Sequence, residues 1–82
     1  MALTVKIVAA GASEIFTDVD LKKETPSHIY VRCWTLGHRP SKNKIWKMTK
    51  AISIGNVAEF NDFVSLDGNG VIIGDTVFII ER

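Results

Sequence analysis

Long hydrophobic runs and paired cysteines are both missing from this sequence. Among its 82 residues there is a single cysteine, Cys33, which cannot form a disulfide within the chain. There is no run of about 18 apolar residues to cross a membrane. The N-terminal residues lack the basic and then apolar stretch of a signal peptide. We therefore expect a protein of the cytoplasm, or one assembled into a particle from there, with no membrane partner.

Patterns that carry catalysis or bind metal are equally scarce. Besides Cys33, only His28 and His38 are soft ligands, too few for a tetrahedral zinc site. The serines stand in no nucleophile motif, and no glycine-rich phosphate loop is present. Residues 67–70, Asp-Gly-Asn-Gly, lack the other oxygen ligands of a calcium loop. The sequence therefore predicts no catalytic residue, no metal and no cofactor, and we interpret the protein as not being an enzyme.

Short stretches in which apolar and polar residues alternate are what the sequence does contain, and such alternation is typical of β-strands. The expected strands cover residues 3–9, 14–21, 28–36, 45–54, 63–66, 71–73 and 76–80. The stretch 28–36 is the clearest, because it is rich in β-branched and aromatic residues. We predict one all-β domain over residues 1–82, a small barrel or sandwich of about six to seven mostly antiparallel strands. One short helical turn is allowed near residues 57–62.

Charge is distributed unevenly along the chain, although the net charge is only +1. Residues 25–58 carry six basic residues and no acidic one, whereas residues 59–82 carry five acidic residues and one basic residue. Such asymmetry points to contacts with a charged partner. Alternatively, the two regions lie side by side in one chain and neutralise each other.

The basic middle segment also contains both tryptophans, and it is the first candidate binding surface. Single-stranded nucleic acid is held by cations on its phosphates and by aromatic rings stacked on its bases. The alternative is that both tryptophans belong to the core and that the lysines are solvated. The predicted basic and aromatic site consists of Arg32, Trp34, Arg39, Lys42, Lys44, Trp46, Lys47 and Lys50, on two strands and the loop that joins them.

The acidic C-terminal segment is the second candidate surface, for self-association. Residues 77–80 carry no charge, and exposed as an edge strand they would invite pairing with another chain. The alternative is that this stretch is buried within the domain. The acidic segment of one copy can also meet the basic segment of the next copy. We therefore expect a homo-oligomer. The predicted self-association residues are Glu59, Asp62, Asp75, Phe78 and Ile80.

Three hypotheses for the function follow from these patterns. The first is a non-enzymatic small β module that acts through protein–protein contacts with itself or another protein. It would be a structural or assembly subunit, with a phage-like virion component as one setting. The second is a nucleic-acid-binding small β-barrel that uses the basic and aromatic region 32–50. The third is a pocket between subunits that binds a small anionic ligand, with Arg32 and Arg39 as clamps.

Overall fold

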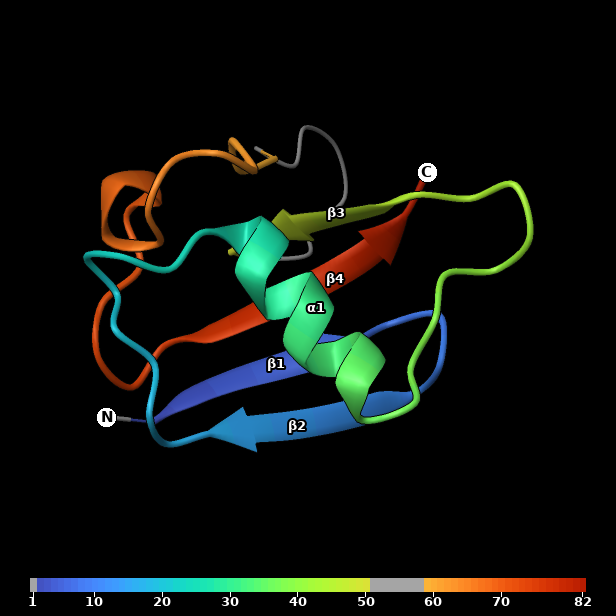
Figure 1. The fold of residues 1–82 in the computed structure, drawn as a ribbon, viewed down its shortest axis with the longest axis horizontal. Helices are drawn as coiled ribbons and strands as arrows, with labels where there is room; N and C mark the ends of the chain where they lie inside the picture. The colour runs from blue at the N-terminus through green and yellow to red at the C-terminus, as the bar shows by residue number, and fades with distance from the viewer. Residues whose placement is uncertain (1, 51–58) are drawn as a thin grey trace.

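One helix packs across one face of a four-stranded mixed sheet (Figure 1). The structure is a computed structural model, and it describes residues 2–50 and 59–82. The strand order in the sheet is β2-β1-β4-β3. In chain order the elements are β1 (Leu3–Ile7), β2 (Ala12–Phe16), α1 (Pro26–Thr35), β3 (Trp46–Thr49), the 3₁₀ helix η1 (Asp67–Asn69) and β4 (Thr76–Glu81).

The predicted all-β barrel or sandwich of six to seven mostly antiparallel strands is wrong. The described residues form a single open sheet, and its two central strands, β1 and β4, run parallel. The expected strand at 28–36 is the helix α1. Residues 63–66 and 71–73 lie in turns and irregular backbone. The short helical turn expected near 57–62 falls partly on residues outside the described ranges, and residues 59–62 are not helical.

Both central strands were predicted from the sequence, and in both of them buried residues alternate with more exposed ones. In β1 the side chains of Leu3, Val5 and Ile7 are buried, and in β4 those of Val77 and Ile79 are buried. The register pairs Val5 with Val77 and Ile7 with Ile79, so these buried residues share the face that α1 covers. Each strand is thus fixed by one apolar face that must leave water.

The helix begins at a reciprocal cap. The hydroxyl of Thr25 accepts from the backbone N–H of His28, while the ring of His28 accepts from the backbone N–H of Thr25. Pro26 occupies the first turn, where its missing N–H costs no hydrogen bond. These two features stop the preceding loop from extending and start a helix instead of a strand.

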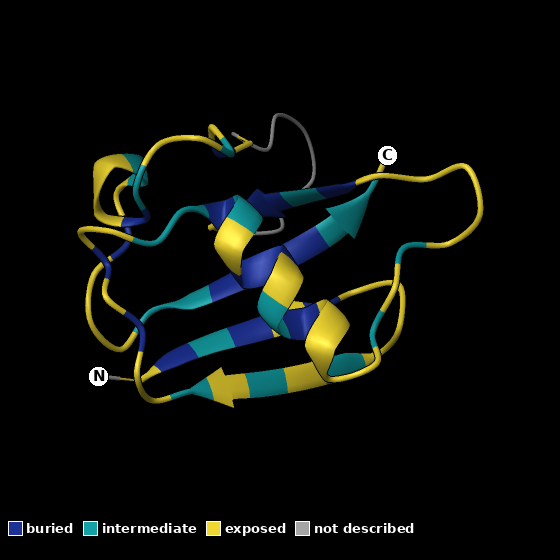
Figure 2. Cartoon of the chain, in the orientation of Figure 1, coloured by how far each residue is buried: buried dark blue, intermediate teal, exposed yellow. Residues whose placement is uncertain are grey.

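The buried residues of α1 recur with helical spacing. Pro26, Ile29, Tyr30 and Cys33 face the sheet, and positions three, four and seven apart fall on one side of a helix. Figure 2 shows this buried stripe against the sheet and the exposed stripe facing outward. The β-branched and aromatic residues of 28–36 favoured a strand by propensity, but burial of one helical face outweighs a propensity of this size.

The segment between β3 and β4 completes the core at one end of the sheet. Phe60, Leu66 and Val71 are buried with the strands and the helix. The backbone N–H groups of Leu66 and Asp67 donate to the carbonyls of Glu24 and Leu21, both at 2.8 Å. This segment therefore packs against the chain that leads into α1.

Candidate functional site

A groove lies between one flank of α1 and the chain that leads into β3. The helix contributes residues three and seven apart, which point to one side. The connection after the helix and the start of β3 form the opposite wall. The groove has a volume of about 400 Å³. We call it the α1 groove, and its lining residues are Ser27, Tyr30, Trp34, Pro40, Lys44, Ile45, Trp46 and Asp62.

The floor of the α1 groove is aromatic. The rings of Tyr30 and Trp46 meet edge to face, with centroids 6.0 Å apart, a favoured geometry for aromatic pairs. Trp46 is only 5% exposed. Both rings are therefore held by the core and form a rigid base for whatever occupies the groove.

A polar network fixes one end of this floor. The hydroxyl of Tyr30 donates to Oδ1 of Asp62 at 2.9 Å, and Nζ of Lys47 donates to Oδ2 at 3.1 Å. The backbone carbonyl of Asp62 accepts from the hydroxyl of Ser27 at 3.1 Å. Burial, reinforced by the Asp62 carboxylate, raises the pKa of Tyr30 well above its usual range. Tyr30 therefore stays protonated and serves as a hydrogen-bond donor.

The rim of the α1 groove exposes large apolar side chains. Trp34 is 41% exposed and Ile45 is 63% exposed. The guanidinium of Arg39 donates to the backbone carbonyl of Trp34 and lies over its ring, 5.9 Å from the centroid. An exposed tryptophan beside an arginine is a composition enriched at protein-binding hot spots.

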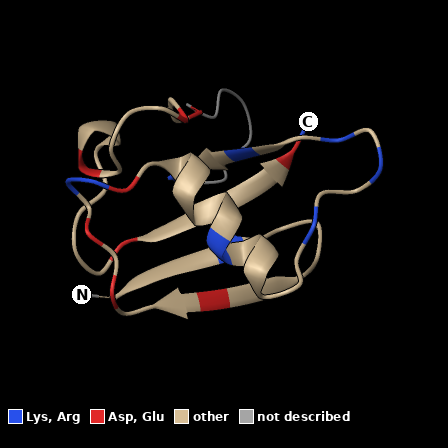
Figure 3. Ribbon diagram, in the orientation of Figure 1, with Lys and Arg blue, Asp and Glu red and all other residues tan. Residues whose placement is uncertain are grey.

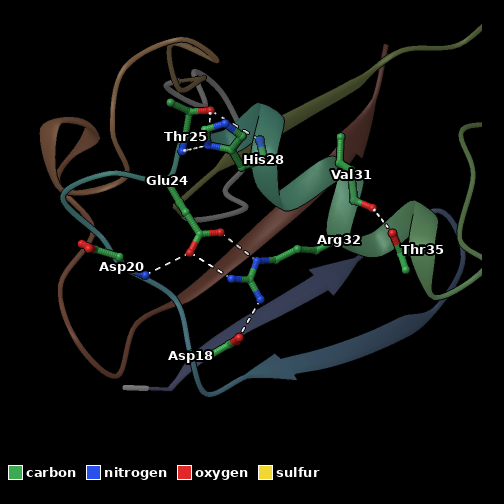
Figure 4. Close-up of polar contacts among 8 residues, drawn as sticks. All are labelled: Asp18, Asp20, Glu24, Thr25, His28, Val31, Arg32 and Thr35. Carbon is green, nitrogen blue, oxygen red and sulfur yellow. Dashed lines mark hydrogen bonds and ion pairs between the residues drawn. The ribbon is translucent and has the colours of Figure 1, made fainter.

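Of the eight residues predicted as a basic and aromatic site, three are engaged elsewhere. Arg32 donates to Glu24 at 2.7 Å and to Asp18 at 2.8 Å (Figure 4). Lys47 pairs with Asp62, and Lys50 pairs with Asp75 at 3.1 Å. These cations bind acidic residues of the same chain, so they do not form a free basic surface. The predicted clamp of Arg32 and Arg39 loses its first member in the same way.

Three cations remain on the connection between α1 and β3. Arg39, Lys42 and Lys44 form no ion pair within 4.0 Å among the residues that the structure describes. Figure 3 shows this connection as a basic loop at one end of the molecule. The loop borders the α1 groove, because Pro40, Lys44 and Ile45 belong to both. The structure thus joins a cationic loop to an apolar groove.

The base of the basic loop is anchored by Glu81 at the end of β4. Its Oε1 accepts from the backbone N–H and the hydroxyl of Ser41, at 2.9 Å and 2.8 Å. These hydrogen bonds, and in smaller part the charge of Lys44, hold the pKa of Glu81 below its ordinary value of 4.5. The carboxylate form therefore stabilises the loop.

We expect Glu81→Gln to lower stability in a pH-dependent way. Because the pKa of Glu81 is lower in the folded protein, its charged form contributes stability above pH 4.5, and this contribution is lost as the pH falls through the lowered pKa. The wild type should be more stable than the variant near neutral pH, and this difference in stability should disappear in acid. Denaturant midpoints measured over a pH series test this. A gap of constant size would show that the carboxylate charge plays no part.

The predicted self-association residues do not form one acidic edge. The carboxylates of Glu59, Asp62 and Asp75 pair with Arg82, Lys47 and Lys50. Phe78 and Ile80 lie in β4, which is bonded to β1 on one side and to β3 on the other. Of the two positions left open for residues 77–80, an exposed edge and a place inside the domain, the structure has the second, because β4 lies in the middle of the sheet.

The two tryptophans do not form an open stacking platform. Trp34 lies on the rim, whereas Trp46 is buried in the floor. Sequence reasoning found Trp34, Lys44 and Trp46, which do meet in the groove, but it missed Tyr30 and Ile45. The spacing of Ser27, Tyr30 and Trp34 was the available signal, since positions three and seven apart form one flank of a helix.

Outside the α1 groove, the side chains that could take part in catalysis or bind a metal have structural roles. His28 caps α1, and burial raises the pKa of the Cys33 thiol to about 11, which keeps it from acting as a thiolate. Within residues 2–50 and 59–82, no group of three or more histidine, cysteine or carboxylate side chains could hold a metal ion. In the same residues, no helix is long and apolar enough to cross a membrane.

Comparison with known proteins finds no matching family model, no matching curated protein and no matching solved structure.

Proposed function

We propose that this chain is a non-enzymatic module that acts through protein–protein contacts, and that the α1 groove is its contact surface. The groove has a rigid aromatic floor and an exposed apolar rim. Exposed apolar patches rimmed by polar residues mark sites of interaction with a partner. A buried aromatic anchor bordered by polar residues is the usual anatomy of a protein interface.

The observation that carries this proposal is the combination of the exposed rim with unpaired cations beside it. Trp34 and Ile45 present apolar surface, while Lys42 and Lys44 bring positive charge and form no ion pair within 4.0 Å among the described residues. Complementary charge steers association and selects partners. The partner that fits is therefore an acidic protein segment with a bulky apolar side chain.

The two other hypotheses receive less support from the same residues. The predicted nucleic-acid surface included Trp46 for stacking and Arg32, Lys47 and Lys50 for phosphates. Trp46 is buried, and the three cations are already paired within the chain. A small anionic ligand clamped by Arg32 and Arg39 would have to displace Glu24 and Asp18 from Arg32. The role of a structural subunit, including one in a virion, is a setting compatible with a protein-binding module and stays a prediction.

Selection of binding peptides tests the proposal even though the natural partner is unidentified. Short random peptides displayed on a surface are selected against the wild-type protein. We expect the enriched peptides to combine acidic residues with a large apolar residue, and to change the fluorescence of Trp34. Trp34→Ala should weaken their binding at least tenfold, since truncating a hot-spot aromatic costs about 2 kcal/mol or more.

A matched control lies on the same helix. Val31 is about as exposed as Trp34 but does not line the groove, so Val31→Ala should leave peptide binding unchanged. Equal losses in both variants, or enrichment of basic peptides, would contradict the proposal. Fluorescence quenching by a single-stranded oligonucleotide, with a steep dependence on salt, would favour the nucleic-acid hypothesis instead.

A further inference from the structure

A second apolar hollow lies at the end of the molecule opposite the basic loop. Its volume is about 540 Å³, and its apolar lining is Leu21, Val71, Ile72 and Ile73. Ile72 and Ile73 are each 64% exposed, which is unusual for two adjacent isoleucines in a domain this small. We call this hollow the Ile72–Ile73 surface.

The turn that presents these isoleucines is held in place. The backbone N–H of Ile72 donates to the carboxylate of Asp75 at 3.0 Å, and the N–H of Gly74 donates to the carbonyl of Ala2 at 3.3 Å. Gly74 has φ +87°, a conformation that suits glycine. The two apolar side chains are therefore displayed on a fixed support, which lowers the entropy cost of docking.

The charge at the Ile72–Ile73 surface is opposite to that of the α1 groove. Asp20 and Asp67 line it, together with the cation Lys22. Neither aspartate forms an ion pair within 4.0 Å in the described part of the chain. The α1 groove instead adjoins the basic loop with Lys42 and Lys44. The residues that line the Ile72–Ile73 surface thus carry a net negative charge, two aspartates against one lysine, whereas the unpaired charges beside the α1 groove are all positive.

The two surfaces cannot meet within one molecule. Figure 1 places residues 18–24 and 67–75 at one end of the sheet and the connection 36–45 at the other end, and Figure 3 shows most of the acidic residues at the first end, together with lysines of the loop before α1, and a basic connection at the second. Two copies placed head to tail, however, bring the acidic end of one against the basic end of the next. Such a contact joins different surfaces, so it is heterologous and extends to a ring or a filament.

We propose that the occupant of the α1 groove is a second copy of this chain, docked through its Ile72–Ile73 surface. This inference rests on the proposed function, since it names the partner of the same groove. Ile72 and Ile73 of one copy lie against Trp34 and Ile45 of the next. The flanking lysines of the groove face Asp20 and Asp67, which fixes the polarity of the contact.

The size of the two surfaces limits how tightly two copies of the chain are expected to associate. A stable interface removes about 800 Å² from each partner, roughly one-sixth of the 5010 Å² accessible surface of this chain. A contact confined to two hollows is smaller than that, so association is expected only at high protein concentration. It should also weaken as salt is added, because its charges lie at the exposed rims.

A charge exchange between the two ends tests this docking. Multi-angle light scattering is measured on the wild type, on Lys42→Glu/Lys44→Glu, on Asp20→Lys/Asp67→Lys and on an equal mixture of the two variants, from micromolar to millimolar concentration. We expect the wild type to associate, each variant alone to stay monomeric, and the mixture to associate again. Recovery in the mixture is expected because the reversed end of each variant then meets an end of opposite charge on the other variant. Adding Ile72→Ser/Ile73→Ser to both variants should abolish the recovery, which attraction between oppositely charged proteins alone would not explain.

Control variants separate the docking from a loss of folding. Lys6 is exposed on β1, outside both surfaces, so Lys6→Glu should leave association unchanged. Ile72→Ser/Ile73→Ser removes the apolar contact without reversing charge and should also give monomers. Circular dichroism of every variant should match the wild type.

The outcomes also separate this inference from the proposed function. A wild type that stays monomeric at millimolar concentration, or a mixture that does not associate, would overturn the self-docking. If the selected acidic peptides still bind in the α1 groove, the proposed function stands and its partner is another protein. If neither the peptides nor a second copy binds there, both proposals fall.

Discussion

Replacing Ile29 with alanine is expected to destabilise the protein by about 2–5 kcal/mol, more than any other single substitution proposed for this chain. The Ile29 side chain is fully buried between α1 and the sheet. Its truncation removes apolar contacts and leaves a cavity that the close-packed core cannot fill. The free energy of unfolding of a domain of this size is only a few kcal/mol, so the variant should be largely unfolded at about 37 °C. Thermal and urea unfolding followed by circular dichroism measure the loss.

Val31 provides a control that also tests the helix itself. In a strand, Ile29 and Val31 would lie on the same face, whereas in a helix they point in nearly opposite directions. Val31 is 53% exposed, so Val31→Ala should change stability by about 0.5 kcal/mol or less. Comparable losses from the two substitutions would contradict the helix and favour a strand over residues 28–36.

Asp62→Ala is expected to cost about 1–3 kcal/mol and to disturb the floor of the α1 groove. The carboxylate accepts from the hydroxyl of Tyr30 and from Lys47, and its side chain is largely shielded from water. Without it, a buried hydroxyl and a partly buried ammonium group both lose their acceptor. Denaturant unfolding measures the loss of stability, and tryptophan fluorescence reports the change around Trp46.

A double-mutant cycle assigns this loss to the network. Lys47→Met removes the cation while keeping most of the aliphatic side chain. In the Asp62→Ala background, Lys47→Met should therefore recover part of the lost stability, whereas in the wild type it should be destabilising. Additive effects of the two substitutions would mean that Asp62 and Lys47 do not interact energetically.

The strands were predictable where one apolar face decides the conformation. Leu3, Val5 and Ile7 alternate with polar residues, whereas Val77 and Ile79 belong to an uncharged apolar run in which only the burial alternates. Strand boundaries were less accurate: the stretch 14–21 contributes only its first residues to β2, which starts earlier, at Ala12. The expected strand 45–54 begins close to the start of β3, and its end lies outside the described residues.

The helix was missed because two signals compete in the same residues. Ile29, Val31 and Cys33 have the types and the alternation of a strand, whereas Ile29, Tyr30 and Cys33 have helical spacing. Thr25 and Pro26 form the start signal of a helix, and this signal resolves the ambiguity. Giving more weight to the cap than to β-propensity would have predicted the helix.

The candidate site was predictable only in part, for a related reason. Lys42 and Lys44 follow α1 in a polar loop, and such residues stay exposed wherever the loop lies. Arg32 was assigned to the same surface from its sequence position alone. On a helix it points instead toward Asp18 and Glu24, so its charge is neutralised.

Three properties follow directly from the amino-acid sequence: the core consists of short apolar stretches, the connection around Lys42 and Lys44 is basic, and paired cysteines are absent. The parallel pairing of β1 with β4, and the groove flanked by Trp34 and Ile45, depend on how the chain folds in three dimensions. Alternation specifies which face of a strand leaves water, but it does not specify the neighbouring strand. Ion pairs such as that between Lys50 and Asp75 depend on how distant segments return to each other, so the surface charge is set by the fold.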